Sequence, residues 1–165
     1  MRLVDPPDTY REPADEVAAH FTGDVVGAAD DLIAAGYGVS CLIVDTIFSS
    51  DGIFAEPVLR GAVDEVRARG GVFIADEVQP GFSRTGASMW GFDRHGVVPD
   101  IVTMGKPMGN GIPIAAMAAR ADVLKPFAVG VPYFNTFGGN PVSMAAASAV
   151  LDVIEQEDLM VNART

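Results

Sequence analysis

A lysine inside a glycine-rich loop is the first residue of this sequence that could do covalent chemistry. Lys106 comes soon after the apolar run Ile101 to Met104 and lies in the segment Gly-Lys-Pro-Met-Gly-Asn-Gly, residues 105–111. A partly desolvated lysine can act as a neutral amine that attacks a carbonyl and forms a Schiff base. A solvated surface lysine is the commoner alternative. The order of residues excludes a Walker phosphate loop, in which the lysine follows the glycines and precedes Ser or Thr.

Two adjacent carboxylates form the second candidate site. Asp76 and Glu77 directly follow the apolar run at residues 72–75, so at least one of them is expected to be partly buried. A buried carboxylate needs a cationic partner. A protonated pyridine nitrogen would be such a partner and would act as an electron sink. An ion pair with Arg84 or Arg94 is the structural alternative, and general acid-base work or a metal are further options for paired carboxylates.

The third candidate is the segment Thr-Phe-Gly-Gly-Asn-Pro at residues 136–141. It combines a hydroxyl group, flexible backbone amides and the start of a predicted helix, which together suit an anion such as phosphate. Capping of that helix by Asn140 is an equally good interpretation. The segment therefore predicts either a phosphate site or a helix start.

Composition narrows the classes of partner. The 11 basic and 22 acidic residues give a formal net charge of −11, which disfavours nucleic acid and anionic lipid headgroups. The apolar runs are shorter than the roughly 18 residues of a membrane span, and Met1 to Asp8 contains no hydrophobic signal core. We therefore expect no membrane segment and a cytoplasmic location.

Cysteine and histidine provide little material for a metal site. Cys41 is the single cysteine and lies in an apolar run, which predicts a small buried side chain rather than a nucleophile. His20 and His95 are isolated in the sequence, so we expect no metal centre.

The elements that position these residues follow from hydrophobic periodicity. The sequence predicts strands at residues 39–46, 72–75, 101–104 and 114–119, the first of them buried on both faces. It predicts helices from residue 24 to about 35, from about 57 to 69, and from 141 to about 157. Strands that alternate with helices indicate an α/β fold with a mostly parallel sheet, in which ligands bind at the carboxyl ends of the strands. Residues 1–20 are predicted to be an irregular lead-in to one domain at 21–165.

The candidate segments, in their order and spacing, resemble the class-III aminotransferases, which are fold type I pyridoxal-phosphate enzymes. The resemblance runs from about Val39 to Asp158. It is carried by Ala-Asp-Glu-Val-Gln at 75–79, Gly-Phe-Ser-Arg-Thr-Gly at 81–86, Pro-Asp-Ile-Val-Thr-Met-Gly-Lys at 99–106 and residues 136–141.

This resemblance implies a role for each site residue. Lys106 would bind pyridoxal 5'-phosphate covalently as a Schiff base and act as the catalytic base, and Asp76 would contact the pyridine nitrogen. Val78 would pack on the ring face and Gln79 would reach the phenolic oxygen. Thr136 would bind the cofactor phosphate of the other subunit, so the resemblance also implies a homodimer.

The implied reaction is transfer of an amino group from an amine or ω-amino acid to a keto or aldehyde acceptor. The segments at 105–111 and 133–143 are similar to a subgroup that also contains phospho-lyases, which eliminate phosphate and ammonia. The stretch Val44 to Phe48 departs from the family, where many members carry Glu-Pro. Family members are also more than twice as long, so we expect this chain to hold part of the large cofactor-binding domain, without its N-terminal part or the C-terminal small domain. A non-catalytic remnant is the remaining alternative.

Overall fold

The computed structural model describes residues 1–54 and 56–165 and shows an α/β fold. The strands are β1 (Cys41–Asp45), β2 (Val72–Asp76), β3 (Ile101–Met104) and β4 (Ala116–Ala119). The α-helices are α1 (Val17–Ala34), α2 (Leu59–Ala68), α3 (Ala121–Gly130), α4 (Pro141–Gln156) and α5 (Leu159–Asn162). Two short 3-10 helices are η1 (Gly91–His95) and η2 (Lys106–Gly109).

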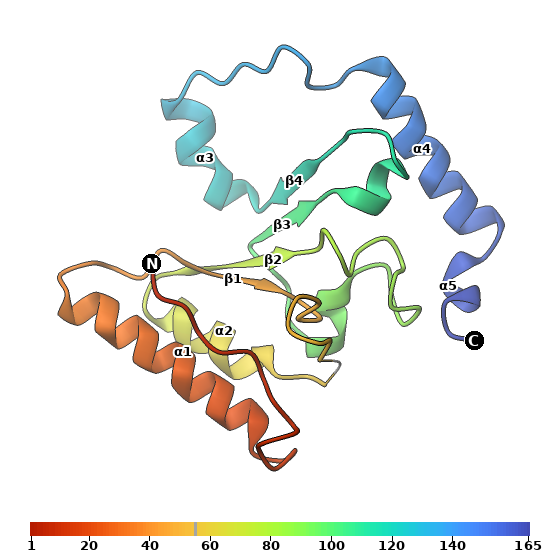
Figure 1. The fold of residues 1–165 in the computed structure, drawn as a ribbon. Coiled ribbons are helices and arrows are strands. Elements are labelled where there is room, and N and C mark those ends of the chain that lie inside the picture. The colour runs from red at the N-terminus through yellow and green to blue at the C-terminus, as the bar shows by residue number, and fades with distance from the viewer. Residues whose placement is uncertain (55) are drawn as a thin grey trace.

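The four strands form one sheet in the order β1-β2-β3-β4 (Figure 1). The first three strands are parallel and β4 is antiparallel to β3, which confirms the predicted mostly parallel sheet. Parallel neighbours need a long crossover connection, and α2 provides it between β1 and β2. Only residues 105–115 connect β3 to β4, so β4 returns in the opposite direction.

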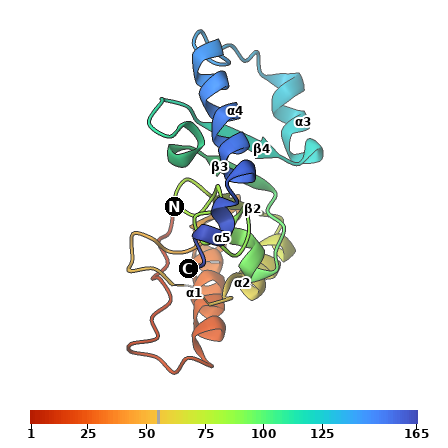
Figure 2. The ribbon, with the colours of Figure 1, turned by 90° about the vertical axis from the view of Figure 1, so that its right-hand side faces the viewer.

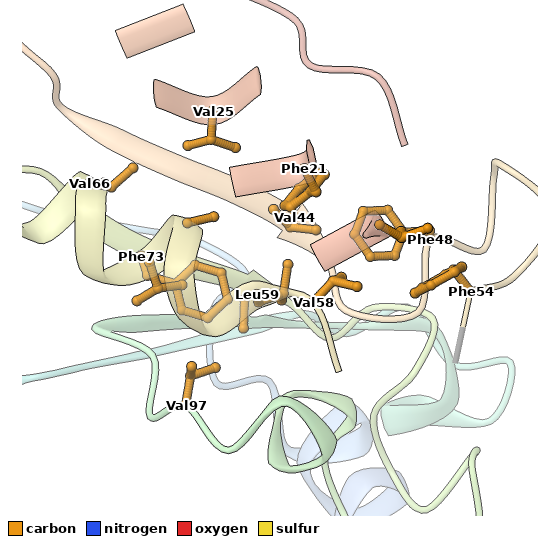
Figure 3. Packing of buried hydrophobic residues seen from close by; sticks show 14 residues of the cluster. Phe21, Val25, Val44, Phe48, Phe54, Val58, Leu59, Val66, Phe73 and Val97 are labelled. Carbon is orange, nitrogen blue, oxygen red and sulfur yellow. The ribbon is translucent and has the colours of Figure 1, made fainter. Parts of the chain in front are cut away.

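The hydrophobic core lies between the sheet and the helices α1 and α2 (Figure 3). Leu59 and Val63 of α2 and Phe73 of β2 are completely buried there. At one end of this core the ring of Phe48 packs edge-on against Phe21 and Phe54, with centroids 5.6 and 6.3 Å apart. Edge-to-face packing suits the charge distribution of aromatic rings. This core supports the sheet from one side.

The first helix begins earlier than the sequence analysis predicted. We expected an irregular segment up to residue 20, but α1 begins at Val17. Its buried stripe is Val17, Phe21, Val25 and Ala29, which recur every four residues. The prediction failed because the acidic and proline-rich residues before Val17 obscure the helical periodicity there. The buried stripe is recognised only once α1 is seen to pack against α2.

Strand β1 is not buried on both faces, which corrects a second expectation. Leu42 packs against the core and Val44 is part of it, whereas Cys41 and Ile43 are exposed. The side chains of a strand alternate between its two faces, and the helices α1 and α2 cover only one face. Cys41 is therefore an exposed cysteine rather than the buried one that we predicted.

Helices α3 and α4 lie beyond the β4 edge of the sheet, away from α1 and α2, whereas α5 returns toward the segment after β2 (Figures 1 and 2). Helix α4 begins where the sequence predicts it, and the Asn140 side chain accepts hydrogen bonds from the backbone N–H groups of Val142 and Ser143. Helix α3 was not predicted, because Pro126 lies inside it and none of its residues is buried. Among the described residues, no helix is long and apolar enough to cross a membrane.

Candidate functional site

The carboxyl ends of the parallel strands bring two of the predicted site residues to one edge of the sheet. Asp76, the last residue of β2, pairs in register with Asp45 of β1 and Thr103 of β3. Lys106 follows β3 by two residues, and the connection carries it past the same edge. Asp76 and Lys106 lie 30 positions apart in sequence, and the register of β2 with β3 brings their strand ends side by side.

Asp76 is oriented by two hydrogen bonds to a single carboxylate oxygen. Its Oδ1 accepts from the backbone N–H of Val78 at 3.0 Å and from the Thr103 hydroxyl at 3.4 Å. The side chain is half-buried, and among the described residues no hydrogen bond or ion pair reaches Oδ2. Oδ2 of Asp76 is therefore free to accept a hydrogen bond from a donor group of a ligand.

Lys106 has an unusual backbone conformation and an exposed side chain. Its φ is +36°, in the left-handed region that L-amino acids other than Asn and Asp rarely adopt. Such backbone conformations cluster at functional sites. The residues alone left open whether this lysine is partly desolvated or a solvated surface residue; its side chain is exposed, and within the described part of the chain no hydrogen bond or ion pair reaches its amine. Lys106 thus follows the end of β3 with a side chain that is accessible to a ligand.

Val78 lies against the backbone that carries the lysine. A Cβ added at Gly105 would be 3.8 Å from both methyl carbons of Val78 and 3.9 Å from Cβ of Ala115, which is ordinary van der Waals contact. The half-buried Val78 side chain thus lies beside the start of the lysine loop. An apolar residue next to both Asp76 and the lysine loop suits a flat ring bound at this edge.

The buried carboxylate of the pair is Glu77, and its partners are not cationic. Its Oε1 accepts from the Thr46 hydroxyl at 2.7 Å and the Phe92 N–H at 2.9 Å, and its Oε2 accepts from the Gly91 N–H at 2.7 Å. Burial raises the pKa of Glu77, although these three hydrogen bonds oppose the increase. The expectation of a cationic partner was wrong for this residue, because neutral donors satisfy it.

Neither arginine of the structural alternative pairs with the two carboxylates. Among the described residues, the ion pairs include neither Arg84 nor Arg94. The same residues contain no group of three or more His, Cys, Asp or Glu side chains placed to hold a metal ion. Among the described residues, Asp76 therefore has no cationic partner.

The structure does not bring every predicted residue to this edge. Gln79 follows Val78 and is exposed, so it can turn toward a ligand. Thr136 is also exposed, in the segment between α3 and α4, which arches away from the sheet in Figure 1. The Asn140 side chain bonds the first turn of α4, which supports the capping interpretation of this segment. The structure thus leaves Thr136 apart from the candidate site formed by Asp76, Val78 and Lys106.

Sequence reasoning missed the residues that support the site from behind. Thr46 and the η1 residues Gly91 and Phe92 bind Glu77, and His95 donates from Nε2 to the Thr46 carbonyl oxygen at 2.7 Å. These partners are 14 to 49 positions apart in sequence. Glu77 was the available signal for these residues, because a carboxylate beside a buried strand requires hydrogen-bond donors. The sequence does not show which residues supply them.

Comparison with known protein families and sequences gives a consistent result. The family model described as aminotransferase class-III matches residues 5–165. The chain is 43% identical over 150 residues to an alanine–glyoxylate aminotransferase 2-like protein of Drosophila melanogaster, covering 89% of this chain and 30% of that protein. It is 49% identical over 126 residues to the mitochondrial alanine–glyoxylate aminotransferase 2 of Homo sapiens, covering 68% of this chain and 24% of that protein. The chain thus spans less than a third of the length of both relatives.

Solved structures resemble this chain in fold as well as in sequence. A phospholyase from Arthrobacter in complex with phosphoethanolamine superposes with a TM-score of 0.90 and 44% identity, over 97% of this chain and 39% of that one. An (S)-enantioselective ω-transaminase from Thermomicrobium roseum superposes with a TM-score of 0.84 and 25% identity, over 96% of this chain and 37% of that one. The sequence match over nearly all of the chain and the shared fold agree: this protein belongs to the class-III aminotransferase family.

Proposed function

We propose that this chain forms the ring-binding part of a pyridoxal-phosphate-dependent aminotransferase, with Lys106 as the residue that attaches the cofactor. The observation that carries the proposal is the register of β2 with β3, which brings Asp76 and the lysine loop to one edge of the sheet. The residues present fit the cofactor ring, because a free carboxylate oxygen, an apolar side chain and a primary amine share that edge. Family membership supports the same function.

The proposed roles follow from the atoms that each residue offers. Oδ2 of Asp76 would accept a hydrogen bond from the protonated ring nitrogen, and its negative charge would keep that nitrogen protonated. Val78 would pack on the ring face, and the amide of Gln79 would donate to the phenolic oxygen. When bound, the cofactor supplies an electron sink for the charge that develops on the substrate carbon. Lys106 would hold the cofactor through Nζ, and the same Nζ, once a substrate amine has taken its place, would be available to move a proton.

The released Lys106 would then act as a general base. Its neutral Nζ would remove the proton from the substrate carbon that bears the amine and would carry it to the C4′ carbon of the cofactor. Proton transfer by a positioned side chain contributes about 10² to 10⁴ in rate. Lys106 is the first residue of the short helix η2, so its side chain is carried by a defined backbone rather than by a long loop.

We propose that Thr136 acts in a homodimer, where its hydroxyl would bind the cofactor phosphate of the other subunit. The exposure of Thr136, away from its own Asp76, supports a role toward a second chain. Large apolar side chains are exposed on both sides of it. These are Phe127, Val131, Tyr133, Phe134, Phe137 and Val142. Exposed apolar patches of this kind mark association surfaces.

The proposed substrates are an amine or ω-amino acid as donor and a keto acid or aldehyde as acceptor. The relatives named alanine–glyoxylate aminotransferase favour this class. The second candidate is a phospho-lyase, favoured by the similarity to the Arthrobacter protein bound to phosphoethanolamine. A non-catalytic remnant is the third, because the chain spans a minor part of the length of its relatives.

Lys106 and Lys125 are the two lysines of the sequence, which allows a sharp test of the attachment site. The chain is mixed with pyridoxal phosphate, reduced with borohydride, digested and mapped by mass spectrometry. The proposal expects the cofactor mass on the peptide with Lys106 in the parent and in Lys125→Ala, and its loss in Lys106→Ala. Equal trapping in Lys106→Ala and in the parent would show that the assignment is wrong.

The same preparation separates the candidate reactions. An aminotransferase converts alanine and glyoxylate to pyruvate and glycine, whereas a phospho-lyase releases inorganic phosphate from phosphoethanolamine. Enzymatic assay of pyruvate and colorimetric assay of phosphate distinguish the two outcomes. If the parent chain carries the cofactor on Lys106 but forms neither product, the remnant is supported.

A further inference from the structure

Glu77 lies behind the candidate site and on the opposite side of the backbone from Asp76. Burial alternates along the chain here: Asp76 and Val78 are half-buried, whereas Glu77 has no exposed surface. This alternation is that of an extended strand, in which successive side chains point to opposite faces. Asp76 and Val78 therefore face the site, and Glu77 faces the interior.

The side chain of Glu77 joins two segments that are distant in sequence. Thr46 lies just after β1, and Gly91 and Phe92 begin η1, and all three donate to the carboxylate at 2.7 to 2.9 Å. A carboxylate is an acceptor-only group, so three donors and no acceptor suit its ionised form. This one side chain thus connects the segment after β1 and the start of η1 to the end of β2.

The backbone of Glu77 is held as well. Its N–H donates to the Thr103 carbonyl of β3 at 2.9 Å, and its C=O accepts from the Gly81 N–H at 3.0 Å. Together with the side chain, Glu77 makes three side-chain and two backbone hydrogen bonds. The residues on either side of it have little freedom to move.

We propose that Glu77 is a positioning residue whose buried carboxylate fixes the Asp76-Val78 turn in the geometry that receives the cofactor ring. The proposal rests on the function proposed above, because that function gives Asp76 and Val78 their ligand. Glu77 does not touch the cofactor itself. It acts through the hydrogen bond between the Val78 N–H and Asp76 Oδ1, whose two residues flank it.

Replacement of Glu77 by glutamine tests the carboxylate with almost no change in shape. The amide nitrogen must take the place of one carboxylate oxygen. In one orientation it faces the Gly91 N–H, and in the other it faces the Phe92 N–H, which are both donors. Either way one buried backbone N–H loses its acceptor, a costly outcome in a protein interior. The turn should loosen although the side chain still fits.

The first readout needs no cofactor. Hydrogen exchange of the Val78 and Gly81 amides is measured by NMR in the full chain, because both donate within the turn. Glu77→Gln is expected to raise both exchange rates at least about tenfold and to weaken binding of pyridoxal phosphate at least about tenfold, as for one unpaired buried donor. Val63→Ala, a core change in α2, is the matched control for general loss of stability.

The control decides between positioning and a purely structural role. Denaturant is adjusted until Val63→Ala and Glu77→Gln have the same free energy of unfolding. The proposal expects Val63→Ala to leave cofactor affinity within about threefold of the parent. If Val63→Ala changes the two amides and the affinity as much as Glu77→Gln does, the positioning role is overturned.

A second pair of variants serves if Glu77→Gln does not fold. Thr46→Val removes one donor to Glu77 and keeps the side-chain shape, while Thr46→Ser keeps the hydroxyl. Thr46→Val should shift both readouts in the same direction as Glu77→Gln, and Thr46→Ser should restore them. A Thr46→Val chain with parental exchange and affinity contradicts the proposal. If the parent fails to bind pyridoxal phosphate at Lys106, the proposed function is wrong. The amide exchange rates then test by themselves whether Glu77 fixes the turn.

Discussion

The backbone N–H of Val78 donates to Asp76 Oδ1 at 3.0 Å, so one turn holds both residues. Asp76 is the proposed partner of the ring nitrogen, and Val78 is the proposed contact of the ring face. A ligand that binds one of them meets the other at a set orientation. This coupling makes the turn, rather than either side chain alone, the unit that would receive the proposed cofactor.

Asp76→Asn should weaken binding of pyridoxal phosphate while keeping the turn intact. The asparagine oxygen can still accept from the Val78 N–H, but the charge that would stabilise a protonated ring nitrogen is lost. Hydrogen bonds to charged groups contribute about 1.5 to 3 kcal/mol, so the dissociation constant should rise at least about tenfold. Titration followed by absorbance measures it. Asp64→Asn, an equal change of charge on the exposed side of α2, is the control, and equal affinities of the two variants would contradict the role of Asp76.

The two histidines should titrate on opposite sides of the ordinary pKa of about 6.5. Burial lowers the pKa of His95, whose Nδ1 accepts from the Val58 N–H at 3.2 Å. A hydrogen bond with Glu12 raises the pKa of the exposed His20. NMR titration of the ring protons measures both values in one sample. A pKa for His95 at or above that of His20 would show this picture to be wrong.

The lowered pKa of His95 also sets the sign of a stability change. Below about pH 6.5 the unfolded chain binds a proton at this residue more readily than the folded chain does. Folding stability contributed by His95 should therefore fall as the pH drops below the ordinary value, because a proton on Nδ1 would face the Val58 N–H. Urea unfolding between pH 7 and pH 5 should show a decline that His95→Gln makes shallower.

Two glycines should respond to alanine in opposite ways. A Cβ at Gly91 would lie 2.4 Å from Thr46 Oγ1 and 2.6 Å from Pro80 Cβ, so Gly91→Ala should cost about 1 to 3 kcal/mol of unfolding free energy. At Gly27, inside α1, a Cβ meets nothing within 4 Å. Gly27→Ala should therefore stabilise the chain by about 0.5 to 1 kcal/mol. Urea denaturation checks both, and a neutral Gly91→Ala would mean that the contact behind the site is loose.

Removal of the α4 cap should destabilise the chain without a change in its core. Asn140 accepts from the Val142 and Ser143 N–H groups at 2.9 and 3.2 Å. Asn140→Ala should cost about 1 kcal/mol in unfolding free energy, and Asn140→Asp, which keeps an acceptor, should cost less. Thermal or urea unfolding of the two variants provides the comparison. Equal losses in both would indicate that the cap bonds contribute nothing.

Much of the fold could be predicted because its signals are local. The strands predicted at residues 72–75 and 101–104 match β2 and β3 closely, and the Asn140-Pro141 pair marks the start of α4. Prediction failed where a neighbour decides the outcome. Helix α3 has no buried stripe for periodicity to detect, and the exposure of Ile43 depends on which face of the sheet the helices cover.

The sequence by itself determined which residues could form the site and in what order along the chain they occur. Its motifs identify Lys106 and Asp76, because a lysine in a glycine loop and a carboxylate after a buried strand are visible without coordinates. Only the tertiary structure decided that these residues share one edge, that Glu77 rather than Asp76 is the buried carboxylate, and that neutral donors satisfy it. The physical reason is that strand register and long-range hydrogen bonds join segments that no local pattern connects.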